Sequence, residues 1–339
     1  MVRDLLKTPL LAVFYASFFF LLEGFMVNGL PVFSESYWET APHYGTDLMG
    51  YLMLLLWAFL LSVIICLAFH FMQDTKILSL IFLGITIIGY QLIIPAVMPV
   101  WYGDRAGILT TADIIFDAAR GAVCTVVLII LAVLLIHPGK AVNPGGKKAP
   151  AEYKIKMPAL IARVLALPFI YLVLYLFSWY FLGWRNEAVR AYSEGPEYSE
   201  SLVTAVVNLL FRDNSVLPVA LCIGLLYVLF ALPLMTRLAS NRGIFAALMF
   251  LLAMLSGVRA LIPVQWIPAQ LSFLFFLRDA SLAALYSISL ALLLHFSYKK
   301  QMVAAAEASG PTKKRAPKDI KVAGVSAQQA ADTLKSTMK

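Results

Sequence analysis

The feature that most constrains this chain is a series of apolar stretches, each about twenty residues long. A helix needs about 20 apolar residues to cross the hydrocarbon core of a bilayer. Charged or turn-forming segments separate eight such stretches, and only 14% of all residues are charged, against about a quarter in soluble domains. The sequence therefore predicts an all-α, polytopic membrane protein. Its helices are expected at 8–30, 48–72, 77–100, 110–137, 158–183, 215–236, 243–264 and 270–297.

Several of these stretches resemble one another in pairs. The heptapeptide GYQLIIP at 89–95 resembles GVRALIP at 257–263, and both lie at the end of an apolar run. A match without gaps pairs 120–137 with 278–295, and each segment begins with arginine and ends with histidine. The offsets of 158 and 168 residues predict a four-helix unit used twice. Since four spans return the chain to the same side, the two repeats are expected to be parallel.

This hypothesis divides the chain into four parts. The repeats are 1–137 and 158–298, joined by a cytoplasmic linker at 138–157 that is rich in glycine, proline and lysine. The second repeat includes an external loop at 184–214 with an amphipathic segment suited to a helix lying on the membrane. A basic tail at 299–339 is expected to be disordered in the cytoplasm.

The distribution of lysine and arginine predicts the orientation. Most of these residues lie at the start of the chain, in the linker and in the tail, and basic segments stay on the cytoplasmic side. Both termini are therefore expected in the cytoplasm, most simply across a bacterial-type inner membrane. The net charge of +8 then reflects topology, with anionic lipid as a partner of the tail and no binding of nucleic acid.

Polar side chains within the predicted spans form the candidate site. An ion in hydrocarbon costs a few kcal/mol unless it is paired or hydrated. At about 1.5 Å of rise per residue, these side chains fall at a similar depth in the outer leaflet. Asp117 and Arg120 are spaced to pair on one helix face, and Arg259 is expected to pair with Asp279 across a hairpin. The candidate outer polar cluster comprises Glu23, Gln91, Asp117, Arg120, Arg259, Arg278 and Asp279.

Motifs of common catalytic chemistry are missing from the sequence, including HExxH, GxxxxGK[ST] and paired CxxC. Cys66, Cys124 and Cys222 fall singly within spans, which favours packing over metal binding or disulfides. We therefore expect no metal and no cofactor, and a non-enzyme is favoured. The polar cluster is then either a set of inter-helix salt bridges or an outward-facing ligand site.

Three functions remain open. The leading hypothesis is a permease-like carrier of a small solute or lipid-like substrate, with its site between the repeats, where Pro95 and Pro263 can bend helices beside a cavity. The alternative is a non-catalytic integral subunit of a larger membrane complex, of respiratory or secretion type, docking other subunits through the external loop and tail. The third is a membrane enzyme acting on a lipid-linked substrate, with an outer carboxylate as its base.

Overall fold

The computed structural model describes residues 2–29, 33–34, 37, 48–72, 76–97, 100, 110–136, 157–193, 201–212, 215–238, 242–258 and 269–295. These residues are almost entirely helical, as expected where no water is present to satisfy peptide groups. Segments labelled η are π-helical. The elements are α1 (Val2–Leu5), α2 (Thr8–Gly29), α4 (Leu48–Phe71), α5 (Lys76–Ile88), η1 (Gly89–Ile93), α7 (Thr111–Leu135), α8 (Met157–Ser178), η2 (Trp179–Trp184), α9 (Glu187–Ser193), α10 (Leu202–Arg212), α11 (Val216–Arg237), α12 (Arg242–Val258), α13 (Ala269–Leu290) and η4 (Ala291–His295).

Seven helices in the described part of the chain are long and apolar enough to cross a membrane, which indicates a multi-pass membrane protein. They coincide with seven of the eight predicted spans. The remaining span, predicted at 243–264, corresponds to α12, whose apolar part Gly243–Val258 is shorter. Residues 259–264 of that span lie outside the described residues. The linker at 138–157, apart from its last residue, and the tail at 299–339 also lie outside them.

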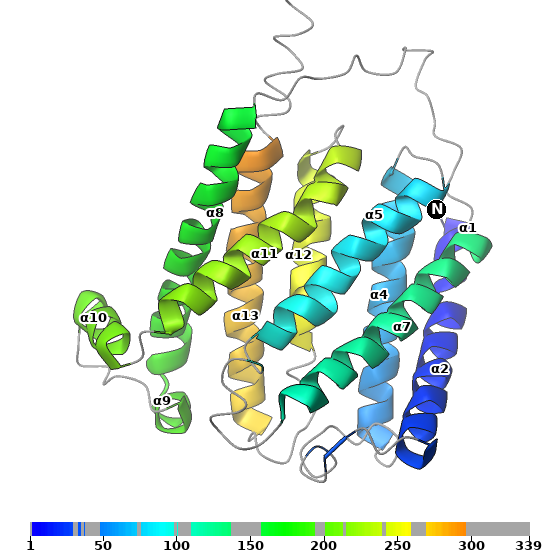
Figure 1. Cartoon of the computed structure of the whole chain (residues 1–339), viewed down its shortest axis with the longest axis horizontal. Helices are drawn as coiled ribbons and strands as arrows, with labels where there is room; N and C mark the ends of the chain where they lie inside the picture. Colours follow the sequence, from blue (N-terminus) through cyan, green and yellow to red (C-terminus); the bar gives the residue numbers. More distant parts are fainter. Residues whose placement is uncertain are drawn as a thin grey trace, which may run out of the picture. The chain divides into compact units, whose positions relative to one another are not determined.

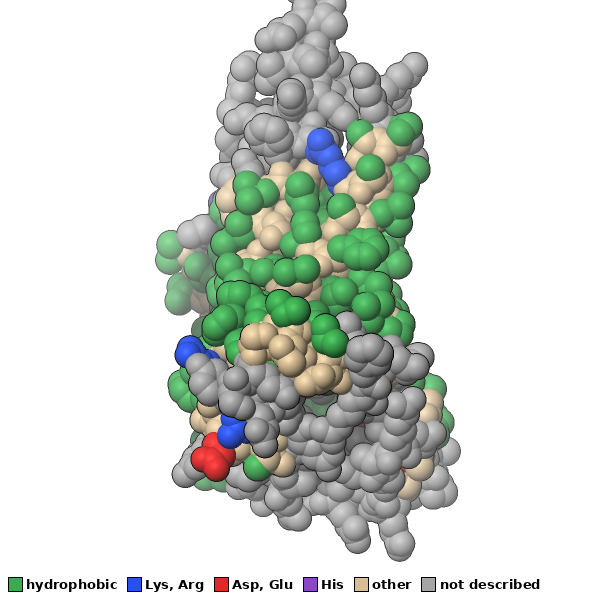
Figure 2. Space-filling view, turned by 90° about the vertical axis from the view of Figure 1, so that its left-hand side faces the viewer, with side chains coloured by type: hydrophobic (Ala, Val, Ile, Leu, Met, Phe, Trp, Pro, Cys, Tyr) green, Lys and Arg blue, Asp and Glu red, His purple; other side chains and the backbone are tan. Residues whose placement is uncertain are grey.

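The outer surface of these helices is strongly apolar. Large side chains such as Leu10, Phe169 and Val173 are more than half exposed. Figure 2 shows one face on which hydrophobic side chains form a continuous surface, with lysine and arginine side chains toward its ends. Soluble monomers rarely expose a patch of this extent, so lipid is the natural environment of this surface.

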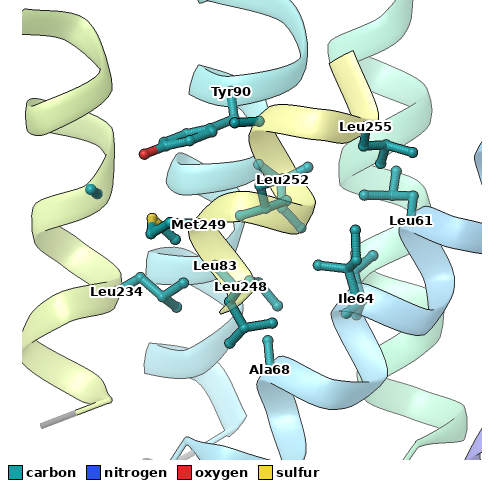
Figure 3. Packing of buried hydrophobic residues seen from close by; sticks show 14 of the residues in the cluster. Leu61, Ile64, Ala68, Leu83, Tyr90, Leu234, Leu248, Met249, Leu252 and Leu255 are labelled. Carbon is teal, nitrogen blue, oxygen red and sulfur yellow. The ribbon is translucent and has the colours of Figure 1, made fainter. Parts of the chain in front are cut away.

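Among the described residues, α2, α4, α5 and α7 form one group of neighbouring helices and α8, α11, α12 and α13 form a second, which can be followed in Figure 1. In the first group, α2 packs along α4 and α7, and α7 packs along α5. In the second group, α8 packs along α11 and α13, and α13 packs along α12. The two groups meet through two pairs of helices: α11 of the second group contacts α5 of the first, and α12 of the second contacts α4 of the first. Figure 3 shows this contact, with Leu252 and Leu255 of α12 beside Leu61 and Ile64 of α4.

The π-helical turn η1 lies where the two groups meet. The Tyr90 hydroxyl donates a hydrogen bond to the carbonyl of Tyr227 in α11 at 3.2 Å. The next side chain, Gln91, is fully buried and donates from Nε2 to the carbonyl of Leu252 in α12. A π-turn accommodates one extra residue in a helix and is frequent at functional sites. Gln91, which the sequence placed in the polar cluster, therefore joins the two groups of helices.

Two smaller features position the helix ends. Thr110 and Asp113 form a reciprocal capping box at the start of α7. Asp113 also accepts hydrogen bonds from the backbone N–H and the hydroxyl of Ser34, at 2.8 and 2.7 Å, which joins Ser34, shortly after α2, to the start of α7. In the predicted external loop, α10 buries Ala205 against Tyr180 and Trp184 of η2.

Candidate functional site: a tyrosine-lined pocket

A cavity of about 270 Å³ lies within the second group of helices, and η1 and the two residues after it close one side. Its length follows α13, where lining residues recur every three or four positions from Asp279 to Leu290. Tyr171, Tyr227 and Tyr286 lie at least eight residues from either end of the apolar spans Pro158–Trp184, Val216–Met235 and Leu271–Leu294, so the cavity extends deep into the bundle. The lining consists of Tyr90, Ile94, Pro95, Tyr171, Tyr175, Ile223, Tyr227, Ala253, Ser256, Gly257, Arg278, Asp279, Leu282, Ala283, Tyr286, Ser287 and Leu290.

Five tyrosines from four helical segments form the body of the pocket. The ring of Tyr171 lies 5.5 Å from that of Tyr227 and 5.1 Å from that of Tyr286. Tyr90 packs edge-on against Tyr227 at 5.0 Å, and Tyr175 stacks along Tyr171 at 6.2 Å. These centroid separations are those of favourable aromatic pairs, so the rings support one another as a rigid wall.

Backbone carbonyls of α11 hold two of these tyrosines in place. The Tyr286 hydroxyl donates to the carbonyl of Gly224 at 2.9 Å, and Tyr90 donates to that of Tyr227 one turn later. Gly224 also allows α8 to approach α11 closely beside Tyr171, because a Cβ on it would lie 2.8 Å from the Cβ of Tyr171. The two hydroxyls are thus engaged by the protein, and aromatic carbon is what these residues offer to a ligand.

An ion pair forms one end of the pocket. Arg278 donates from Nε and Nη2 to Asp279, at 2.8 and 2.6 Å, and both contacts end on Oδ1. The guanidinium lies 4.1 Å from the ring centre of Trp179 and 5.1 Å from that of Phe275. The side chains of Arg278 and Asp279 are 15% and 35% exposed, so both remain accessible from the cavity that they line.

A second cluster of charged side chains lies among the helices of the first group, around Arg120. Arg120 is almost fully buried and is bonded to Asp117, one turn earlier on α7, as their spacing predicts. It also donates to the Tyr37 hydroxyl at 3.0 Å and lies 4.0 Å from Glu23 of α2. Its guanidinium stacks on Phe19 with 4.4 Å to the ring centre. Two carboxylates and aromatic faces thus surround this one cation.

The structure therefore distributes the predicted cluster over three places. Glu23, Asp117 and Arg120 lie together in the first group, Arg278 and Asp279 line the pocket, and Gln91 lies between the groups. Arg259 lies outside the described residues, and so does its predicted pairing with Asp279. Among the described residues, Asp279 bonds to its neighbour Arg278.

Sequence reasoning missed the tyrosine wall. The available signal was the depth of Tyr171, Tyr227 and Tyr286, because tyrosine is typical of membrane interfaces and these lie in mid-helix. Within the described ranges, no group of three or more histidine, cysteine, aspartate or glutamate side chains could hold a metal ion.

Comparisons with known proteins returned no match: no family model, no curated protein and no solved structure is similar to the chain. What can be said of its class rests on its own helices, which indicate an integral, multi-pass membrane protein.

Proposed function

We propose that this membrane protein is a carrier of a small solute and that the tyrosine-lined pocket is its binding site. The pocket itself carries this proposal, because it lies deep among apolar helices yet is lined by an ion pair, Arg278 with Asp279. Polar groups at such a depth are costly and commonly mark a substrate pathway. Binding near the bilayer midplane, with walls from two helical units, is also the usual arrangement in secondary transporters. Here Tyr90 and Pro95 contribute a wall from the first group.

The proposal includes two parallel four-helix repeats that move relative to each other. Its support is a set of contacts that recurs between the first and fourth helices of each group. Lys7 donates to the carbonyl of Leu135 at the end of α7, and Arg163 donates to that of Leu293 in η4. Cations are favourable at helix C-termini, where carbonyls lack partners within the helix.

The same helix pairs share a second contact, about halfway along α2 and α7. Arg120 of α7 stacks on Phe19 of α2, and Arg278 of α13 stacks on Trp179 of η2. These corresponding positions are 156 to 160 residues apart along the chain. Together with the crosswise packing of α5 on α11 and α12 on α4, they favour a twofold axis along the membrane normal. In this arrangement both termini lie in the cytoplasm, as the basic residues predict.

Two-sided accessibility of the pocket tests the carrier without knowledge of its solute. Ser256, a half-buried residue of the pocket, is replaced by cysteine in a chain whose three native cysteines are alanine. We expect a membrane-impermeant maleimide to label Ser256→Cys both in intact bacterial cells and in inverted vesicles, because a carrier opens its site to each side in turn. A cysteine appended after Lys339 marks the cytoplasmic side and should react only in inverted vesicles.

Ser62→Cys is the matched control. Ser62 is fully buried in α4 and, like Ser256, donates to a carbonyl of its own helix, but it does not line the pocket. It should stay unlabelled in both preparations. Labelling of Ser256→Cys from one side only, or from neither while the protein remains monodisperse, would contradict the carrier. Stoichiometric partners co-purifying with such a one-sided protein would support the subunit function instead.

A further inference from the structure

We infer that the pocket binds a zwitterion with an amine and a carboxylate close together on an aromatic or branched apolar body. This inference rests on the proposed function and names the substrate class of the same site. Its basis is the polarity of the cavity along α13, with Arg278 and Asp279 at one end and Tyr286 and Leu290 toward the other. A complementary solute has a charged head and an apolar body.

The charged end of the solute is inferred from the polar atoms of Arg278 and Asp279 that their ion pair does not use. Both contacts to Asp279 use Oδ1, and among the described residues its Oδ2 accepts no hydrogen bond. Arg278 uses Nε and Nη2 in these contacts, which leaves Nη1 as a donor. One anionic acceptor and one cationic donor thus remain on this pair. An ammonium on Oδ2 and a carboxylate on Nη1 would satisfy both with charge-assisted hydrogen bonds.

Charge balance excludes the simpler alternatives. The pair is neutral, so a cationic or anionic solute would bring a net charge into the apolar bundle, at a cost of several kcal/mol for an uncompensated ion. A zwitterion adds no net charge. The rings of Trp179 and Phe275, 4.1 and 5.1 Å from the guanidinium carbon, hold Arg278 in place by cation–π contacts, and its planar fork of N–H donors suits a carboxylate.

The body of the solute follows from the tyrosines. Tyr90 and Tyr286 donate their hydroxyl hydrogens to carbonyls of α11, so these two groups have no hydrogen left to donate to a solute. Their ring carbons, with Leu282, Ala283 and Leu290, make an apolar surface. At about 270 Å³ the cavity lies just below the usual range for drug-sized ligands, about 300–1,000 Å³, which suits a small molecule.

Protection of Ser256→Cys from alkylation in the purified, detergent-solubilised protein tests this class. The probes are L-phenylalanine, phenethylamine, which lacks the carboxylate, and 3-phenylpropionate, which lacks the ammonium. We expect L-phenylalanine to slow alkylation at a concentration at least about tenfold lower than either analogue, since each lost bond to a charged group costs about 1.5–3 kcal/mol. Arg278→Gln should abolish the advantage over phenethylamine, and Asp279→Asn the advantage over 3-phenylpropionate.

Tyr51→Phe is the control, because it removes a tyrosine hydroxyl from α4, where Tyr51 stacks on Phe20 and does not line the pocket. It should keep the order of the three probes. If phenethylamine protects as well as L-phenylalanine, the pocket is a cation site and the zwitterion is wrong. If no probe protects while Ser256→Cys still reacts from both sides of the membrane, the zwitterionic substrate class is contradicted and the carrier function is not. Loss of two-sided labelling contradicts the carrier itself.

Discussion

Replacing Arg120 with leucine is expected to lower the free energy of unfolding by about 3–5 kcal/mol, because it leaves two carboxylates near a buried site without their cation. Arg120 is the bonded partner of Asp117 and lies 4.0 Å from Glu23. The stacking on Phe19 is lost as well. The shift in the unfolding midpoint of the purified protein in mixed detergent micelles measures this loss. Adding Asp117→Leu should recover part of it, and adding Glu23→Gln should recover more.

Arg278→Leu is the matched control for this prediction. It removes the corresponding arginine of α13, but that side chain is 15% exposed, against 2% for Arg120, and its partner Asp279 is 35% exposed. Arg278→Leu also leaves one carboxylate behind where Arg120→Leu leaves two, of which Glu23 is only 16% exposed, so its loss of stability should be clearly smaller. Equal losses in the two variants, or a triple variant no more stable than Arg120→Leu alone, would show that Arg120 is not held by these carboxylates.

Replacing Gly224 with alanine is expected to lower the free energy of unfolding by about 1–3 kcal/mol through overpacking. A Cβ at this position would lie 2.9 Å from the Cα of Pro168 and 2.8 Å from the Cβ of Tyr171. Because the first of these is backbone, α8 and α11 must separate. The carbonyl of Gly224 would then move away from Tyr286, so alkylation of Ser256→Cys should change in rate along with the thermal midpoint.

Gly24→Ala provides the comparison, since a Cβ at Gly24 of α2 would meet nothing within 4 Å. There the helix-forming preference of alanine should leave stability unchanged or raise it by about 0.5–1 kcal/mol. If Gly224→Ala is tolerated as well as Gly24→Ala, the close contact between α8 and α11 is not a feature of the folded protein.

The helices themselves could be predicted from the sequence because a membrane span is a local property. The thickness of the hydrocarbon core sets the length of a span, and the apolar nature of that core sets its composition. Seven of the eight predicted spans therefore reappear as long apolar helices. The pairing of Asp117 with Arg120 was equally local, since it needs only a helical spacing of three residues. The capping box at Thr110 belongs to the same kind of feature.

The pocket could not be predicted because it depends on how each helix is rotated against its neighbours. Tyr90 and Tyr227 are 137 positions apart, and nothing in either helix alone indicates that their rings meet. In a fully apolar helix the periodicity that would show the buried face is weak. The π-turn at Gly89–Ile93 adds a local change of rotation that no sequence pattern announces. Arg278 was therefore assigned to one cluster with Arg120, although it lines a separate pocket.

The most direct test of a two-unit carrier is an experimental structure in lipid nanodiscs, in which residues 8–135 are superposed on 157–295. We predict that a rotation about the membrane normal brings Arg120 onto Arg278 and Phe19 onto Trp179, with the tyrosine-lined pocket at the height of the bilayer midplane. Units that superpose only after one is inverted across the membrane, or a structure in which side chains fill the pocket, would contradict this.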